Sequence, residues 1–349
     1  MHAKFLLITL FLFSSFIVSA QDKSYDKSDS ERNGVSTVTV PPNNINVIRV
    51  KDSIYMLKGR GGNIGVSVGE NGIFMIDAQF AEASFNIQQR IRSISKKPLE
   101  ILINTHHHPD HIGGNSSIAE LGTMIFSHSN ARSRMEASFG KSDIQKIDSI
   151  IQRSEGKIRT EEDKKDVMMN AKRIVSEMPK TKSPEGALPV VSFSEDITFN
   201  YNGEEIKVIH LSNAHTDGDV MVYFTKSNVL HTGDAFFNGK YPYVDLKSKG
   251  SLKGHVEGLI RILRTVNPDT KIIPGHGEIA TIEDVKYTIG MFRFLTENVK
   301  FQIASKKTES EITAMRDFTK EYDEKGYGDG FITTESFLKM LYSELARKR

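Results

Sequence analysis

The feature that most constrains this chain is a run of imidazoles and one carboxylate directly after a short apolar segment. Residues 99–104, LEILIN, predict a buried strand. The next seven residues read THHHPDH, and the side chains that can bind a metal are His106, His107, His108, Asp110 and His111. Imidazole nitrogens and carboxylate oxygens are the usual ligands of zinc and related metals. Two imidazoles two positions apart can converge on one ion, and an adjacent Asp-His pair can face a second ion.

Three further ligand candidates also follow predicted strands. His215 comes after residues 205–211, Asp234 after residues 229–232, and His276 after residues 271–273. Loops at strand ends are where a rigid sheet presents functional groups. We interpret the other histidines as structural or as supports of ligands; they are His107, His128, His210, His231 and His255.

The hydrophobic pattern predicts an α/β protein. In the first half we expect strands at residues 46–58, 62–77, 99–104 and 124–127, and a hairpin turn at Asn71-Gly72 divides residues 62–77 into two strands. Helices are expected at 81–96 and 116–121. In the second half we expect a helix at 252–266 and strands at residues 190–199, 205–211, 220–225, 229–232 and 271–273. Runs of strands with helices between them favour two sheets packed face to face, with helices outside.

Between the halves lies a charged helical insertion, about residues 131–189. Isoleucines at 144, 147, 150 and 151 share one predicted helix face, and apolar residues from 167 to 178 share another. We therefore expect the insertion to form a helical hairpin, which is either a surface elaboration without function or a cap over the substrate site.

The C-terminal extension, residues 296–349, is predicted to be mostly helical. Its segment 323–337 superficially resembles a calcium loop, but Lys325, Tyr327 and Ser336 stand where acidic ligands belong. We therefore predict a turn before a last helix at 335–346.

The N-terminus predicts export. Residues 1–20 carry Lys4, an apolar run and a small-residue ending, which is typical of a signal peptide cleaved before Gln21. Residues 21–45 are polar and predict a flexible leader, so that the main domain begins at residue 46. The protein is then periplasmic or secreted, with no membrane contact after cleavage. The chain has no cysteine, which excludes disulfides, a cysteine nucleophile and thiolate ligands.

Composition argues for a small-molecule substrate. The net charge is +2, and no cluster of basic residues indicates nucleic-acid binding. The sequence does not predict an oligomeric state.

The order HxHxDH, then His215, then Gly233-Asp234, then Pro274-Gly275-His276-Gly277, resembles the metallo-β-lactamase superfamily over about residues 46–290. The resemblance implies an αββα sandwich with metals at one edge. His106, His108 and His215 would hold the first metal. Asp110, His111 and His276 would hold the second, with Asp234 bridging both. Asp77 matches the family's carboxylate that supports a ligand histidine.

This resemblance implies a hydrolase with two Zn²⁺ ions per chain. Two nearby metals can share a water and lower its pKa to about 7, which supplies a hydroxide without a serine or cysteine. Asp110 would lie beside that water as the catalytic residue. Lys240 could meet a substrate carboxylate and Asn238 an oxyanion, although a surface lysine and a turn asparagine are the simpler interpretation.

Two features point to different substrates. An aspartate at 234, where β-lactamases of the superfamily carry Cys or Ser, resembles lactonases, thioesterases of the glyoxalase II type and RNA-processing nucleases. Export favours a β-lactamase. We therefore expect hydrolysis of an ester- or amide-type bond, with a β-lactam or lactone favoured. The alternatives are a mononuclear iron persulfide dioxygenase, a glyoxalase II-type thioesterase and a non-enzymatic metal-binding protein.

Overall fold

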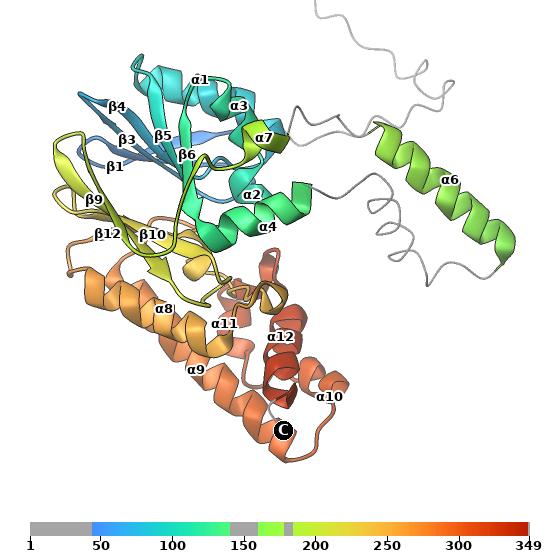
Figure 1. Ribbon diagram of the computed structural model, residues 1–349. Helices are drawn as coiled ribbons and strands as arrows, with labels where there is room; N and C mark the ends of the chain where they lie inside the picture. Colours follow the sequence, from blue (N-terminus) through green and yellow to red (C-terminus); the bar gives the residue numbers. More distant parts are fainter. Residues whose placement is uncertain (1–43, 140–159, 178–183, 348–349) are drawn as a thin grey trace, which may run out of the picture. The chain divides into compact units, whose positions relative to one another are not determined.

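The computed structural model describes residues 44–139, 160–177 and 184–347 (Figure 1). The predicted signal peptide, the leader up to residue 43 and the isoleucine face at 144–151 lie outside the described residues. Within the described ranges, no helix is long and apolar enough to cross a bilayer.

The first sheet has seven strands in sequence order. Its last four strands are parallel, and the others pair antiparallel. The strands are β1 (Asn46–Lys51), β2 (Ile54–Lys58), β3 (Ile64–Gly69), β4 (Gly72–Ile76), β5 (Leu99–Asn104), β6 (Met124–His128) and β7 (Val191–Phe193).

The second sheet has five strands in the order β12-β11-β10-β9-β8. They are β8 (Ile197–Tyr201), β9 (Glu204–Leu211), β10 (Asp219–Phe224), β11 (Val229–His231) and β12 (Lys271–Ile273). The turn at Asn202-Gly203 joins β8 to β9, with positive φ at both residues.

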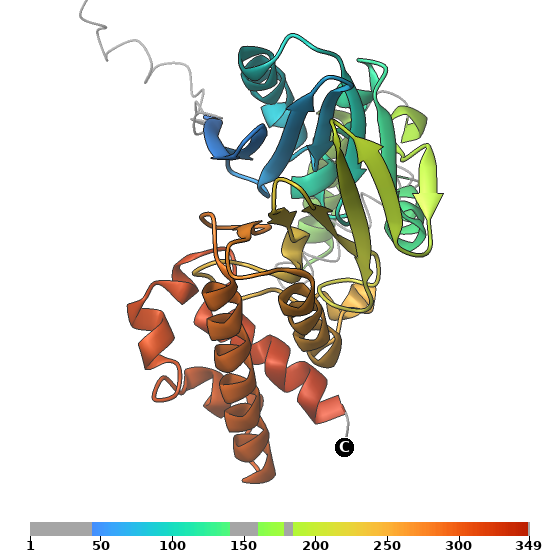
Figure 2. The same ribbon diagram turned by 90° about the vertical axis from the view of Figure 1, so that its left-hand side faces the viewer.

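Alternation along the central strands builds the layers. Phe74 and Ile76 of β4 point into the core between the sheets, whereas Ile73 and Met75 point to the opposite face. That opposite face packs against α1 (Ser84–Ile94) and α3 (Asn115–Ala119), and the outer face of the second sheet packs against α8 (Leu252–Thr265). Figures 1 and 2 show the resulting helix-sheet-sheet-helix order. The predicted α/β sandwich is confirmed.

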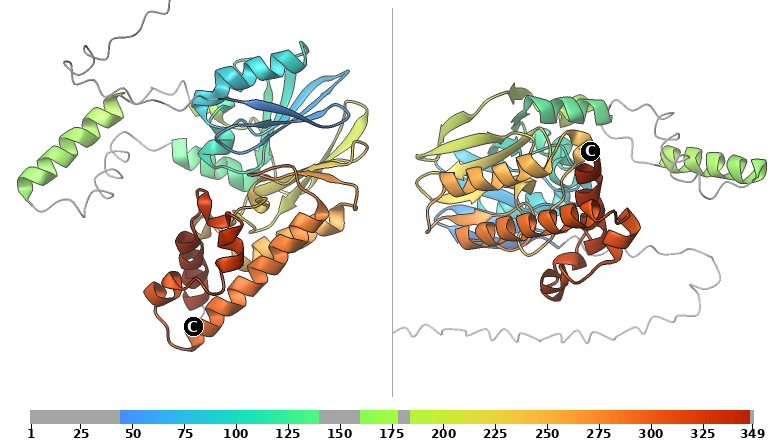
Figure 3. Two further views of the ribbon diagram at one scale, coloured as in Figure 1. Left: turned by 180° about the vertical axis from the view of Figure 1, so that it is seen from behind. Right: turned by 90° about the horizontal axis from the view of Figure 1, so that it is seen from below.

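The C-terminal region is helical and has its own core. Its elements are α9 (Ile282–Ala304), α10 (Glu309–Ala314), α11 (Lys320–Glu324), the short 3₁₀ turn η5 (Tyr327–Asp329) and α12 (Thr334–Arg347). Capping boxes at Thr281 and Thr308 begin α9 and α10. Figure 3 shows α9 beside α8. The core of this region includes Phe292, Phe337 and also Tyr241, which belongs to a loop of the sandwich.

The insertion contains three described helices: α4 (Ser129–Phe139), α6 (Glu161–Glu177) and α7 (Pro184–Ala187).

Three sequence-based boundaries differ from the structure. Residues 190–199 form two strands in different sheets, because the polar residues Ser194, Glu195 and Asp196 carry the chain from β7 to β8. Residues 46–58 form a hairpin that turns at Asp52, whose φ is 47°. Helix α9 is continuous across the predicted boundary between residues 295 and 296.

Candidate metal centre

The histidine run lies in the loop after β5, and Asp77 at the end of β4 holds that loop. The Thr105 backbone N–H and hydroxyl donate to the two carboxylate oxygens of Asp77, each at 2.7 Å. Pro109 then opens the short helix α2 (Pro109–Ile112), which places Asp110 and His111 in the first turn after His108. Asp77 itself has a φ of 61°, a strained conformation that this site maintains.

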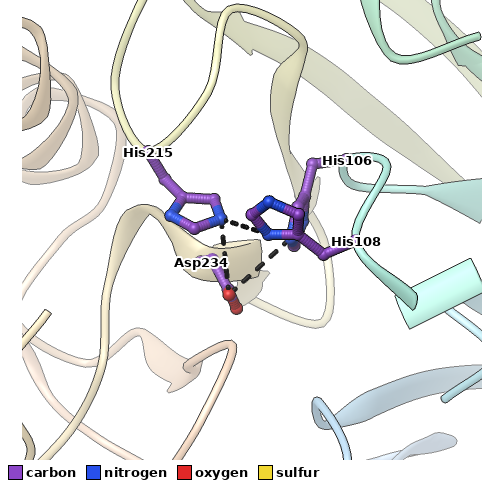
Figure 4. A group of neighbouring side chains, drawn as sticks. All are labelled: His106, His108, His215 and Asp234. Carbon is purple, nitrogen blue, oxygen red and sulfur yellow. Dashed lines mark hydrogen bonds and ion pairs between the residues drawn. The ribbon is translucent and has the colours of Figure 1, made fainter. Parts of the chain in front are cut away.

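The loops after β9, β11 and β12 bring the other three candidates to the same place. Ligand atoms of His106, His108, His215 and Asp234 lie within 4.8 Å of one another, and so do those of Asp110, His111 and His276. Figure 4 shows the first group, with His215 and Asp234 facing the histidine loop. The structure therefore brings together all seven residues that the sequence nominated, although their role as ligands stays a prediction.

Asp234 lies between the two groups. Its Oδ2 is 3.7 Å from Nε2 of His106 and 3.6 Å from Nε2 of His215. Its Oδ1 is 3.1 Å from Nε2 of His111 and 3.5 Å from Nε2 of His276. One carboxylate oxygen thus faces each group, which is the arrangement that a bridging ligand requires.

In four of the histidines, the ring nitrogen that faces away from the cluster is hydrogen-bonded, and this determines the tautomer of each ring. His215 Nδ1–H donates to the Tyr243 carbonyl at 2.7 Å, because a carbonyl can only accept. His108 Nε2–H donates to Asp245 at 3.1 Å, and His111 Nδ1–H donates to Asp77 at 2.7 Å. His106 Nδ1 lies 3.0 Å from the Thr105 hydroxyl, whose own hydrogen goes to Asp77. Where such a ring is neutral, its other nitrogen directs a lone pair inward.

Those inward lone pairs fit a cation. His215 Nε2 lies 2.9 Å from His108 Nδ1, which in turn lies 3.1 Å from His106 Nε2. Facing acceptors at such distances repel unless a positive charge lies between them. Beside the second group, His111 Nε2 and Asp234 Oδ1 form a buried ion pair, 3.1 Å apart, and neither atom has a regular hydrogen bond among the described residues. An ion bound there could be coordinated by both atoms.

Electrostatics distinguish the two groups. Burial lowers the pKa of His215 to about 3 and holds the pKa of His106 well below its usual range, so these rings stay neutral. Burial also opposes charge on His276, but Asp234 and Asp110 outweigh it and raise the pKa of His276 to about 9. The pKa of His111 is likewise raised, against burial, by Asp234, Asp77 and Asp110. The second group therefore carries excess negative charge that protons or a metal must balance.

Two glycines make room for these side chains. A Cβ at Gly62 would overlap the His111 ring, and a Cβ at Gly275 would overlap Oδ1 of Asp234. These positions need glycine because the backbone passes directly against the site.

A third set of potential ligands overlaps the first. It contains His107, His108 and Asp245. Nε2 of His108 already donates to Asp245, and His107 Nε2 lies 3.3 Å from the Ser248 hydroxyl. We therefore assign this set to support of His108.

A cavity of about 580 Å³ opens onto the site. His108, Asp110, Asp234 and His276 line it, together with Lys240. Other lining residues are Arg60, Phe80, Phe237, Tyr243 and Phe331. Asn238 does not line it, and its side-chain amide donates to the Glu278 carbonyl.

Sequence reasoning missed Tyr243 and Asp245. Tyr243 acts through its carbonyl, which has no sequence signature. Asp245 follows Asp234 in a loop without a recognisable motif, although an unassigned aspartate close to a metal motif was a usable signal.

Comparison with known proteins agrees with this geometry. The statistical model of the metallo-β-lactamase superfamily matches residues 57–276, more than half of the chain. The DIM-1 metallo-β-lactamase structure has a TM-score of 0.52 at 14% identity, covering 71% of this chain and 97% of its own. A metallo-β-lactamase from Pontibacter korlensis has a TM-score of 0.51 at 16% identity, and the match covers 72% of this chain and 99% of that protein.

A third solved structure is a double mutant of the sec-alkyl sulfatase PisA1. It has a TM-score of 0.59 at 18% identity. The match covers 86% of this chain but only 50% of that protein. Identities this low show a shared fold alone.

Proposed function

Because this chain belongs to the metallo-β-lactamase superfamily, we propose that it is an exported hydrolase that holds two zinc ions and opens an ester- or amide-type bond. A β-lactam or lactone is the favoured substrate. His106, His108 and His215 would hold one ion, and Asp110, His111 and His276 the other, with Asp234 shared.

The observation that carries the proposal is the position of Asp234, with one oxygen toward each group. When bound, the ions would supply an activated water and polarise the substrate carbonyl. The outer hydrogen bonds to Asp77, Tyr243 and Asp245 hold the histidine rings in orientation, which limits reorganisation during the reaction.

Asp110 is suited to the catalytic role. Its side chain is 24% exposed and lines the cavity, whereas Asp234 is 5% exposed. Burial alone would raise its pKa, but His111 and His276 outweigh burial and lower the pKa of Asp110. An ionised carboxylate that lines the cavity can accept a hydrogen bond from the attacking water and orient it.

Hydrolysis of a panel of compounds tests the proposal. The full chain, loaded with zinc, is assayed against a cephalosporin, a homoserine lactone, a thioester, a phosphodiester and a secondary alkyl sulfate, with and without a chelator. We expect turnover of the cephalosporin or the lactone that the chelator abolishes and zinc restores. Turnover that the chelator does not affect, or no turnover of either compound, would refute the proposal.

The panel also separates the hydrolytic alternatives. Activity on the thioester alone indicates the glyoxalase II type, and activity on the sulfate alone indicates a sulfatase. The dioxygenase needs a separate measurement: one iron per chain in the protein as isolated, with oxidation of a persulfide, would indicate it.

A further inference from the structure

Phe331 is an exposed aromatic side chain in a well-anchored loop. It is 90% exposed, although Tyr327 and Ile332 on either side of it are 7% and 8% exposed within the C-terminal core. A single exposed apolar side chain is common on protein surfaces, so exposure alone does not mark Phe331 as functional. Its position at the cavity does, because a fixed aromatic ring that lines the cavity can contact a ligand there.

Phe331 borders the cavity on the side of the first metal group. Its ring meets the Tyr243 ring edge-on, with centroids 6.4 Å apart, and both residues line the cavity. The Tyr243 ring lies 5.6 Å from that of His215 and 6.2 Å from that of His108. Phe331 and Tyr243 thus form an apolar wall beside three converging imidazoles.

Of the cations that line the cavity, which are Lys58, Arg60 and Lys240, Arg60 lies on the side of the second group. The Arg60 guanidinium lies over the Phe80 ring, 4.9 Å from its centroid. Between them and the second group is Gly61, at which a Cβ would be 3.2 Å from Phe80 and 2.8 Å from the Asp110 carbonyl. Among the described residues, no acid pairs with Arg60, in contrast to Lys58, which pairs with Glu278.

We propose that the cavity binds an anionic amphipathic small molecule, with its aliphatic or aromatic body on Phe331 and Tyr243 and its anionic group at Arg60. The reacting bond then lies between these two anchors, over the two metal groups. The reaction rests on the proposed function, but the binding preference does not. Phe331 is accordingly a specificity-determining residue that the C-terminal extension contributes.

Binding of unreactive probes tests this preference without turnover. Straight-chain alkanesulfonates of four, six, eight and ten carbons are titrated calorimetrically into the zinc-loaded full chain. We expect the Kd to fall about two- to fourfold for each added methylene that the wall covers. Phe331→Ala should weaken decanesulfonate binding about tenfold and leave butanesulfonate binding within about twofold.

Two variants complete the design. Arg60→Gln should weaken all four probes by a similar factor, about tenfold, because it removes the charged partner and not the wall. Phe301→Ala is the matched control, since Phe301 is 67% exposed on α9 and does not line the cavity. It should change no Kd.

The outcomes separate this inference from the proposed function. A Kd that is independent of chain length, or a Phe331→Ala variant with unchanged chain-length dependence, overturns the inference even if the protein hydrolyses esters. Retained chain-length dependence without any hydrolysis supports the inference and refutes only the proposed function.

Discussion

Tyr241 stacks on Phe337, with ring centroids 4.7 Å apart and an interplanar angle of 12°. Tyr241 lies in the loop that also supplies Tyr243 and Asp245 to the ligand histidines, and Phe337 lies in the last helix. The Tyr241 hydroxyl also donates to Asp323 at 3.0 Å. The C-terminal helices therefore hold a loop of the metal centre in place.

This contact predicts a large stability effect. Phe337 is fully buried, so Phe337→Ala leaves a cavity and should lower the free energy of unfolding by about 3–5 kcal/mol. Urea denaturation measures this change, with Phe301→Ala as the exposed control, expected within about 0.5 kcal/mol. Equal effects of the two substitutions would show that the extension is not packed as described.

Asp234→Ala should remove the second metal and activity together. The substitution deletes both carboxylate oxygens, one of which faces each group. The loss of kcat should therefore exceed the about 10- to 100-fold that is typical when a residue supporting a ligand is changed. Metal content and turnover are measured on the same sample, with the exposed Asp269→Ala as control. Full metal loading with unchanged turnover would exclude the bridging role.

Asp245→Asn should weaken the first site while leaving the fold intact. Asparagine keeps the shape but loses the charge that holds His108 Nε2–H, so the affinity for the first metal should fall about 10- to 100-fold. Competition with a chromogenic chelator measures this affinity separately from activity. An unchanged affinity would reduce Asp245 to a capping residue for the turn at Lys247 and Ser248, to whose N–H groups it also accepts.

Metal binding should release protons mainly at the second group. With a pKa raised to about 9, His276 is protonated at pH 7 in the metal-free protein and must lose that proton to coordinate. Affinity at this group should therefore rise as pH increases toward 9. His215, with a pKa lowered to about 3, is already neutral and adds no pH dependence above pH 5. Calorimetry in buffers of different ionisation enthalpy counts the protons, and equal release at both sites would contradict this assignment.

The predicted cleavage before Gln21 can be checked by mass spectrometry of the exported protein. Its N-terminus should be Gln21, whereas retention of residues 1–20 would indicate an uncleaved anchor.

The clustering of the candidate ligands was largely predictable because metal-binding side chains leave a local pattern in the sequence. His106 to His111 form one uninterrupted run, and His215, Asp234 and His276 each follow a recognisable strand. The support from Tyr243 was not predictable, because any residue offers a carbonyl. Neither was the placement of Phe331 at the cavity, since it depends on long-range packing of Ile332 and Tyr327 against Tyr241. The single strand predicted for residues 190–199 was wrong because the polar residues Ser194, Glu195 and Asp196 carry the chain from one sheet to the other.

The central claim is that seven side chains from four loops hold two metals. Anomalous diffraction at the zinc edge, from crystals grown with zinc, tests it most directly. We predict two peaks about 3.5–4 Å apart, one bounded by His106, His108 and His215 and the other by Asp110, His111 and His276, with Asp234 between them. A single peak, or peaks away from these residues, would contradict the account.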